Sequence, residues 1–272
     1  MANYILKAVK TFWEGYDLSG RMHTHSLTAT VTAPEDTHHG VNDRTYLPGL
    51  KGHSLTLGGY HDNATILDPD KRIEAELGQA DTIITVCAVD GAEEDIGYCF
   101  KAATSTYSPI EGGIGDVTGF TASATGNGTL IRGKVMATGE ETTSATGTGI
   151  ELYGMTEGEV AYLCVHCYAL DATSLDIVVQ SDTTVDFDDD PTARSFSQAQ
   201  FTAVGAQWLT FTAPADITTH DCWRVNSTLT GGNTTASYMV TLMVVQGEAG
   251  VSVPPAAISA IAETADPTVV IA

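Results

Sequence analysis

The chain has 272 residues, of which 43% are hydrophobic and only 17% are charged, and its formal net charge is −22. This acidic balance argues against binding to duplex DNA, RNA or anionic membranes, because such binding needs Lys and Arg to neutralise phosphates. The polar surface must consist largely of Thr, Ser, Asn and Gly, and Thr favours strands, so the composition predicts a mainly β fold with many turns. Met1 to Lys10 lacks the pattern of a signal peptide, and no membrane-spanning stretch is expected.

Residues 1–138 are predicted to form a first unit of strands with one short helix. Apolar residues alternate with threonines from Ser26 to Thr32, which is typical of a half-buried strand. A helix is expected over Asp70 to Ala80, where apolar residues lie four apart and a glycine ends the pattern. Further strands are expected at His53–Tyr60, Asp81–Val89, Gly97–Ala102 and Thr129–Ala137.

Residues 139–149 are rich in Thr, Gly, Ala and Glu without apolar periodicity, so they are predicted to be a linker. Residues 150–247 are predicted to form an antiparallel β-sandwich of Ig-like or jelly-roll-like type, because strands and turns follow one another without a helix. Residues 248–272 are expected to be a C-terminal tail. The strands expected in the sandwich are Glu159–Leu170, Ser174–Ser181, Ala206–Ala213, Asp221–Leu229 and Ala236–Gln246.

The five cysteines are expected to be reduced and mostly buried, because their number is odd and no signal peptide is expected. Cys164 and Cys167 have the spacing of a redox or zinc pair, but they fall in a predicted strand. Residues three apart in a strand point to opposite faces, so core cysteines are favoured over a metal or redox pair. A metal site formed by His166, His220 and Cys222 is the alternative.

The acidic cluster at Asp186, Asp188, Asp189 and Asp190 supplies oxygen atoms of the kind that Ca²⁺ prefers. It lacks the spacing and the glycine of an EF-hand loop, so a solvated acidic turn is favoured over a calcium site. No phosphate-binding glycine loop, nucleophile elbow or catalytic carboxylate pair is present. The sequence therefore predicts a protein that is not an enzyme, with no catalytic residues, no cofactor and no required metal.

Three short sequence motifs in the first unit occur in a recognisable order, and the most specific is RTYLPGLKG at Arg44–Gly52. It is preceded by DLSG at Asp17–Gly20 and followed by GDVTGF at Gly115–Phe120. This order resembles the tail tube (major tail) proteins of long-tailed viruses, either siphovirus-like phages or archaeal viruses. The resemblance covers about half the chain, and the second unit is similar to outer β-sandwich domains of virion proteins.

The resemblance implies a structural virion protein that assembles into hexameric rings, which stack into the tail tube. Genomic DNA would pass through the tube without binding, along an acidic lumen, and the tape measure and tail-end proteins would be partners. Assembly would take place in the host cytoplasm, the sandwich would project outward, and the tail would dock on a neighbouring subunit. A loop between residues 33 and 48 would reach a neighbouring ring through Glu35, Asp36, His38, His39, Arg44, Tyr46 and Pro48.

Two functions from other classes remain open. A carbohydrate-binding or host-adhesion module would need an exposed aromatic platform made by Tyr162, Tyr168, Trp208 and Trp223. Trp223 is expected in the core, because it lies between apolar residues of a predicted strand. A capsid decoration protein is the other alternative, and it would form trimers rather than rings or tubes.

Overall fold

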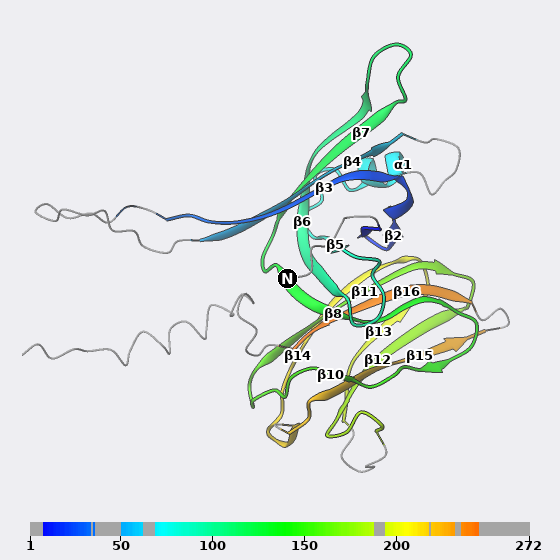
Figure 1. The fold of residues 1–272 in the computed structure, drawn as a ribbon. Coiled ribbons are helices and arrows are strands. Elements are labelled where there is room, and N and C mark those ends of the chain that lie inside the picture. Colours follow the sequence, from blue (N-terminus) through cyan, green and yellow to red (C-terminus); the bar gives the residue numbers. More distant parts are fainter. Residues whose placement is uncertain are drawn as a thin grey trace, which may run out of the picture.

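The structure is a computed structural model that describes residues 8–33, 35, 50–61, 69–187, 194–217, 219–231 and 235–244. The described chain folds into an 11-stranded sheet and a 5-stranded sheet, with antiparallel strand pairs throughout both (Figure 1). It contains one α-helix, α1 (Pro69–Ala75), and two short 3-10 helices at Ser19–Arg21 and Ala215–Ile217. The predicted class, mainly β with one short helix, is confirmed.

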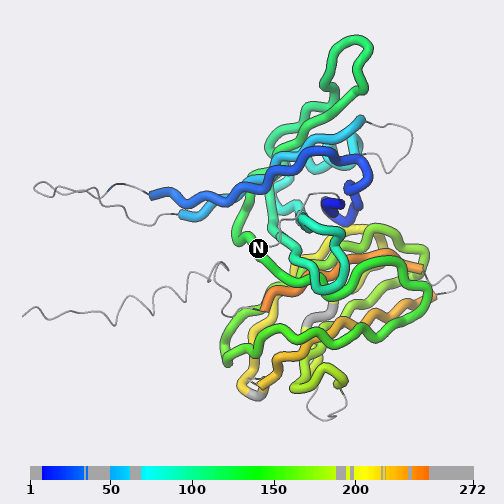
Figure 2. The backbone as a smooth tube through the Cα atoms, viewed as in Figure 1, coloured from blue at the N-terminus to red at the C-terminus, as the bar shows by residue number. Residues whose placement is uncertain are grey.

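The strands of the N-terminal half are β1 (Lys10–Trp13), β2 (Tyr16–Asp17), β3 (Met22–Val31), β4 (Lys51–Tyr60), β5 (Thr82–Cys87), β6 (Ile96–Glu111), β7 (Gly119–Gly126) and β8 (Ile131–Glu141). Those of the C-terminal half are β9 (Ala145–Thr146), β10 (Ile150–Glu151), β11 (Val160–Leu170), β12 (Ser174–Asp182), β13 (Arg194–Phe201), β14 (Gly205–Thr212), β15 (Cys222–Thr230) and β16 (Ala236–Met243). The long strand pairs β3–β4 and β6–β7 extend away from the rest of the molecule (Figure 2).

The large sheet runs through both halves of the chain, in the order β14-β11-β16-β8-β6-β5-β1-β2, and β7, β4 and β3 extend it from β6. β8 makes this continuity possible, because Ile131–Lys134 pair with β6 while Lys134–Ala137 and the residues after them pair with β16. The small sheet contains β10, β15, β12, β13 and β9. It packs against β14, β11, β16 and β8, which completes a two-sheet sandwich with a core between its layers.

Two main cores follow from this arrangement. The N-terminal core contains Trp13, Leu18, Ile73, Ile84 and Phe100 and lies under the β3-β4-β7-β6 region. The C-terminal core lies inside the sandwich and includes Trp223, whose side chain is fully buried. Two smaller apolar clusters, one around Cys99 and Cys164 and one around Phe12 and Met239, join the two halves across the large sheet.

Most predicted strands coincide with observed ones, but three features differ. The helix ends at Ala75 rather than Ala80, since Leu77 forms a bridge with Thr104 and Gly78 adopts a φ of +83°. The expected linker 139–149 contains the end of β8 and all of β9, which pair with β16 and β15. Its strands are held by backbone hydrogen bonds, so they form without apolar side chains of their own. Five strands, β1, β2, β7, β10 and β13, do not correspond to any expected strand.

Candidate assembly surface

β3 is an edge strand of the large sheet: within the described part of the chain it pairs with β4 alone. The Thr32 N–H donates to the Leu50 carbonyl oxygen at 3.0 Å, a distance typical of such bonds, in the register that continues the β3–β4 pairing. In an antiparallel pair the backbone groups of alternate residues point inward and outward. The backbone N–H and carbonyl groups of the even-numbered residues from Thr24 to Thr30 therefore point toward β4. Those of Leu27, Ala29 and Val31 point to the open edge.

A second open edge lies on the other side of the same four strands. β6 is 16 residues long, and its pairing with β5 ends at Ala102. Thr104 forms an isolated bridge with Leu77. After it, the segment 105–111 pairs with β7 and with no other strand among the described residues. The sheet β3-β4-β7-β6 thus has β3 at one edge and residues 105–111 of β6 at the other, and both edges present backbone groups suited to strand addition.

One face of these four strands carries hydroxyl side chains in register. Thr28, Ser54 and Thr125 form one cross-strand row, and the next row contains Thr56 and Ser123, whose hydroxyl oxygens lie 3.4 Å apart. We call this surface the hydroxyl face, and its members are Thr24, Ser26, Thr28, Thr30, Ser54, Thr56, Thr106, Ser108, Thr121, Ser123 and Thr125. Glu111, which accepts a hydrogen bond from Thr121, adds one carboxylate at its end, and no described member is Lys or Arg.

The opposite face of the same strands is apolar and buried. Leu55, Leu57, Phe120, Ala122 and Ala124 are at most 1% exposed and pack into the N-terminal core. The difference between the two faces follows from the alternation of side chains along a strand. Because the core covers only one face, the hydroxyl face is left bare in the isolated chain.

The β6–β7 hairpin ends in an exposed apolar tip. Ile110, Ile114 and Val117 are all more than 70% exposed, and Gly112 and Gly115 in the turn have positive φ angles. Large aliphatic side chains gathered at a projecting tip are typical of a contact surface. The tip lies at the far end of the hairpin from the sandwich (Figure 1).

The loop residues predicted for assembly are only partly visible. Glu35 is exposed and lies just beyond the end of β3, whereas Asp36, His38, His39, Arg44, Tyr46 and Pro48 fall outside the described residues. Of the acidic cluster, Asp186 is exposed in a turn, and Asp188, Asp189 and Asp190 also fall outside the described residues. The tail at 248–272 is outside them as well.

Cys164 and Cys167 lie on opposite faces of β11, as the strand geometry predicted. Cys164 belongs to the small apolar cluster around Cys99 that joins the two halves, Cys167 belongs to the sandwich core, and all five cysteines are free and buried. Burial raises the pKa of Cys167 to about 11 and that of Cys222 to about 12, which keeps both thiols protonated at neutral pH. These thiols are therefore packed side chains with little nucleophilic thiolate.

His166 is fully buried and connects the two halves of the molecule. Its Nδ1 accepts a hydrogen bond from the Gly15 N–H at 3.3 Å, and its Nε2 lies 2.8 Å from Thr85 Oγ1. Burial lowers the pKa of His166 to about 3, so the ring is neutral and donates from Nε2 to the threonine. His220 bonds instead to Ser181, and no group of metal ligands forms among the described residues.

The four aromatic residues considered for a sugar-binding platform are separated. Trp223 is buried in the sandwich core, and its Nε1 donates to the Tyr153 carbonyl. Tyr168 packs against Phe12 at the junction, with ring centroids 5.3 Å apart. Tyr162 and Trp208 are neighbours, but both are partly buried against the cluster around Cys99 and Cys164. These four residues therefore do not form one exposed platform.

No helix in the described residues is long and apolar enough to span a membrane. No family model matches the sequence, and no curated protein matches it either. Among solved structures, the chain is similar to a chain of the virion of a native gene transfer agent particle, at 11% identity and a TM-score of 0.36, over 44% of this chain and 92% of that one.

Two further solved structures are similar over nearly half of the chain. One is a chain of the sheath-tube complex of an extracellular contractile injection system, PVC, in its extended state, with 15% identity and a TM-score of 0.37 over 47% of this chain and 89% of that one. The other belongs to the baseplate of the anti-feeding prophage, with 13% identity and a TM-score of 0.37 over 48% of this chain and 97% of that one.

Proposed function

We propose that the chain is a structural, non-enzymatic virion subunit that assembles into hexameric rings, which stack into a tail tube. The observation that carries this proposal is the four-stranded sheet β3-β4-β7-β6, with an open edge on each side, one packed face and one bare face. The resemblance of residues 1–138 to tail tube proteins supports the same function.

Ring formation is proposed to continue this sheet from one subunit to the next. The β3 edge of one copy pairs with residues 105–111 of β6 in its neighbour, so each copy contributes four strands. Such a head-to-tail contact between two different edges closes into a ring when the rotation per subunit is right. Closure removes the exposed edges, which otherwise invite uncontrolled aggregation.

The hydroxyl face is proposed to line the passage for DNA. A wall with no described Lys or Arg neutralises no phosphates, so DNA passes without the counterion release that drives binding. Among the described residues Glu111 is the one carboxylate of this face, so the wall is proposed to be largely neutral, whereas the resemblance implied an acidic lumen. The part of the chain after Thr138 has 17 acidic and two basic residues. The sandwich that it contains then projects outward and keeps the assembly soluble.

Stacking of rings is assigned to the projecting hairpins. The far ends of the β3–β4 pair and of the β6–β7 hairpin, whose apolar tip contains Ile110, Ile114 and Val117, project away from the cores, where a neighbouring ring is within reach. In a virion assembled in the host cytoplasm, tape measure and tail-end proteins would contact the lumen and the terminal rings.

A proline at the open edge tests the ring contact. In Ala29→Pro the N–H that points away from β4 is lost, while the β3–β4 hydrogen bonds stay. We expect the variant to sediment as a monomer under conditions in which the native chain forms rings or tubes, measured by analytical ultracentrifugation.

Ala29→Ser is the matched control, because it keeps the N–H at the same position, and it should assemble like the native chain. Both variants should have the thermal midpoint of the native monomer to within a few degrees. Assembly by Ala29→Pro at the native concentration threshold would contradict the edge contact, and native trimers would favour a decoration protein.

A further inference from the structure

The sheet β3-β4-β7-β6 projects from the molecule at both ends of its strands (Figure 2). β4 begins at Lys51, which pairs with Val31 of β3, and it ends at Tyr60, which pairs with Gly119 of β7. The turn of the β6–β7 hairpin directly precedes Gly119, so the apolar tip lies beyond the Tyr60 end of β4. The β3–β4 pair projects from the opposite end, and the 10 residues of β4 separate the two ends by roughly 30 Å.

The projecting end of the β3–β4 pair exposes aliphatic side chains. Val31 is 51% exposed and Leu50 is 84% exposed, and they lie on adjoining strands. Lys51, directly opposite Val31, is also exposed. We call Val31, Leu50 and Lys51 the arm end. The described segments 22–33 and 50–61 contain no Asp or Glu, and Glu35 is the nearest described acid in the chain.

The apolar tip has a complementary character. Its three aliphatic residues are each more than 70% exposed, and Glu111 and Asp116 lie among them without any Lys or Arg in residues 110–118. The turn is held in shape, because the Gly113 N–H donates to the Asp116 carboxylate at 2.9 Å and the Asp116 N–H donates to the Gly113 carbonyl. A turn that is already ordered loses little conformational entropy when it is buried in a contact.

We propose that the apolar tip of one copy packs against the arm end of a second copy in the adjacent ring, so that all rings stack with the same polarity. The two surfaces differ and lie at opposite ends of one sheet, so the contact is head-to-tail and repeats along the stack without closing. Aliphatic side chains that are bare in the single chain leave water at this contact, and Lys51 meets the carboxylates of Glu111 and Asp116.

This inference rests on the proposed function, because it needs the rings. It concerns the axial contact between rings, whereas the pairing of β3 with residues 105–111 of β6 forms each ring. The two contacts use different residues, so they can fail separately.

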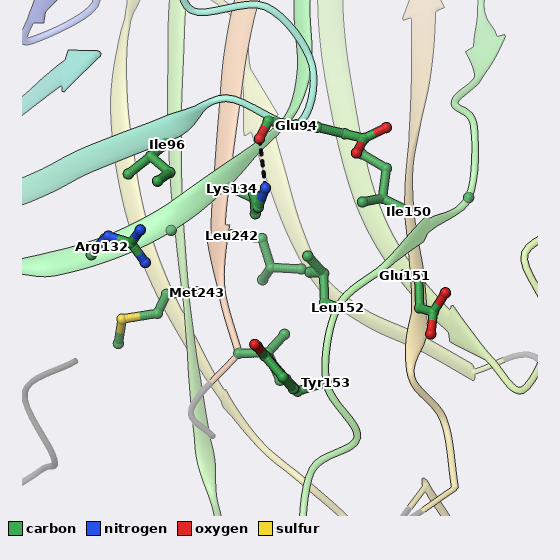
Figure 3. Close-up of a pocket in the computed structure, with 13 residues that line it drawn as sticks. Glu94, Ile96, Arg132, Lys134, Ile150, Glu151, Leu152, Tyr153, Leu242 and Met243 are labelled. Carbon is green, nitrogen blue, oxygen red and sulfur yellow. Dashed lines mark hydrogen bonds between the residues drawn. The ribbon is translucent and has the colours of Figure 1, made fainter. Parts of the chain in front are cut away.

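The groove shown in Figure 3, with a volume of about 560 Å³, fits the tip less well than the arm end does. Its aliphatic residues Ile150, Leu242, Met243 and Val244 are at most 7% exposed. Its charges balance, with two basic and two acidic lining residues: Arg132, Lys134, Glu94 and Glu151. The groove therefore offers neither bare apolar surface nor net positive charge to an acidic, apolar tip.

Cross-linking of cysteine variants tests which surfaces meet. Leu50→Cys and Ile114→Cys place thiols on the arm end and on the apolar tip, and the double variant carries both, while the five native cysteines are buried. Assembled tubes are treated with a short bismaleimide and separated on a denaturing gel. We expect a ladder of covalent polymers from the double variant, because each copy is linked to the copies before and after it. Each single variant should stay monomeric on the gel, and peptide mapping should join position 50 to position 114.

The other outcomes separate this inference from the proposed function. Cross-linked dimers of one single variant would mean that like surfaces meet. Tubes of the double variant without links between positions 50 and 114 would place the tip on another surface, such as the groove. Either result overturns the axial contact and leaves ring formation intact, whereas a native chain that forms no rings would overturn both.

Ile114→Asp tests the apolar part of the contact. The new carboxylate stays in water in the single chain, but it must be desolvated when the tip is buried. We expect single rings and about tenfold less protein in tubes that pellet in the ultracentrifuge. Val185→Asp, at a residue 46% exposed in the turn after β12, is the matched control and should form tubes like the native chain. An unchanged yield of tubes from Ile114→Asp would contradict the proposal.

Discussion

At the scale of single residues, His166 shows how a buried polar group can hold two parts of a chain together. It lies on β11, yet its hydrogen bonds reach Gly15 and Thr85 in the N-terminal half. Thr85 in turn donates to Cys99 Sγ at 3.1 Å, so the chain of hydrogen bonds crosses the junction. Because the ring is buried without a carboxylate partner in this network, only its neutral form fits the site.

The pH dependence of stability follows from this environment. The pKa of His166 is about 3 in the folded chain and near 6.5 when unfolded, so below pH 6.5 the unfolded state binds the extra proton. His53 and His25, whose pKa values are also lowered by burial, act in the same direction. The contribution of these histidines to the free energy of unfolding is therefore fully present above pH 6.5 and is lost as the pH is lowered.

Urea unfolding at pH values between 7 and 5 measures this dependence. These pH values lie above the usual pKa values of carboxyl groups, so histidines dominate the change. The free energy of unfolding should fall by about 1–2 kcal/mol from His166 alone. His166→Asn should be less stable at pH 7 but should show a shallower decline. A native chain whose stability is constant from pH 7 to pH 5 would contradict a buried neutral imidazole.

At the scale of elements, the sequence predicted strands where apolar and polar residues alternate clearly, as in β3 and β12. β7 was missed because its buried positions include Ala122 and Ala124, which give a weak apolar signal. Its alternation with Thr121 and Ser123 was the available clue. β1 was missed because it is four residues long and three of them are buried, so it shows no alternation.

The candidate surface was harder to predict than the strands that form it. Whether an edge is open depends on which distant strands pair, and β6 pairs with β5, β7 and β8 in different parts of its length. Local sequence patterns carry no information on which distant strands pair, so the open edge at residues 105–111 could not be predicted. The loop residues taken from the resemblance remain a prediction, because apart from Glu35 they lie outside the described residues.

The contact between β8 and β16 depends on a glycine. A Cβ atom on Gly133 would lie 2.6 Å from the Leu242 carbonyl oxygen, a backbone atom that cannot move aside without separating the strands. Gly133→Ala should therefore lower the free energy of unfolding by about 1–3 kcal/mol, measured by urea denaturation. Gly20→Ala, where no atom lies within 4 Å of the added carbon, should change it far less. Equal effects would argue against the close approach.

At the scale of the whole molecule, the two halves form one sheet with a packed junction. Ile83, Cys99 and Ile131 from the N-terminal half pack with Cys164 and Met243 from the C-terminal half. At the β1–β2 turn, Gly15 approaches the backbone of Gly205 so closely that a Cβ atom would lie 2.4 Å away. The sandwich is therefore expected to keep a fixed orientation relative to the assembling sheet.

This junction predicts cooperative unfolding. β8 pairs with β6 of the N-terminal half and with β16 of the C-terminal half, so the two cores cannot separate without breaking these pairs. The Ala29→Pro chain is expected to stay monomeric, so its calorimetry should report the monomer alone and should show one heat-absorption peak. Two well-separated peaks would show that the halves unfold independently and that the junction contributes little.

The central claim is that β3 of one subunit pairs with residues 105–111 of β6 in the next, to close a ring around the hydroxyl face. A cryo-electron microscopy structure of the assembled full-length protein tests it most directly. The account predicts six-fold rings with a continuous sheet and the hydroxyl face turned toward the lumen. Rings in which β3 keeps an open edge, or in which the hydroxyl face turns outward, would contradict it, as would a protein that stays monomeric at high concentration.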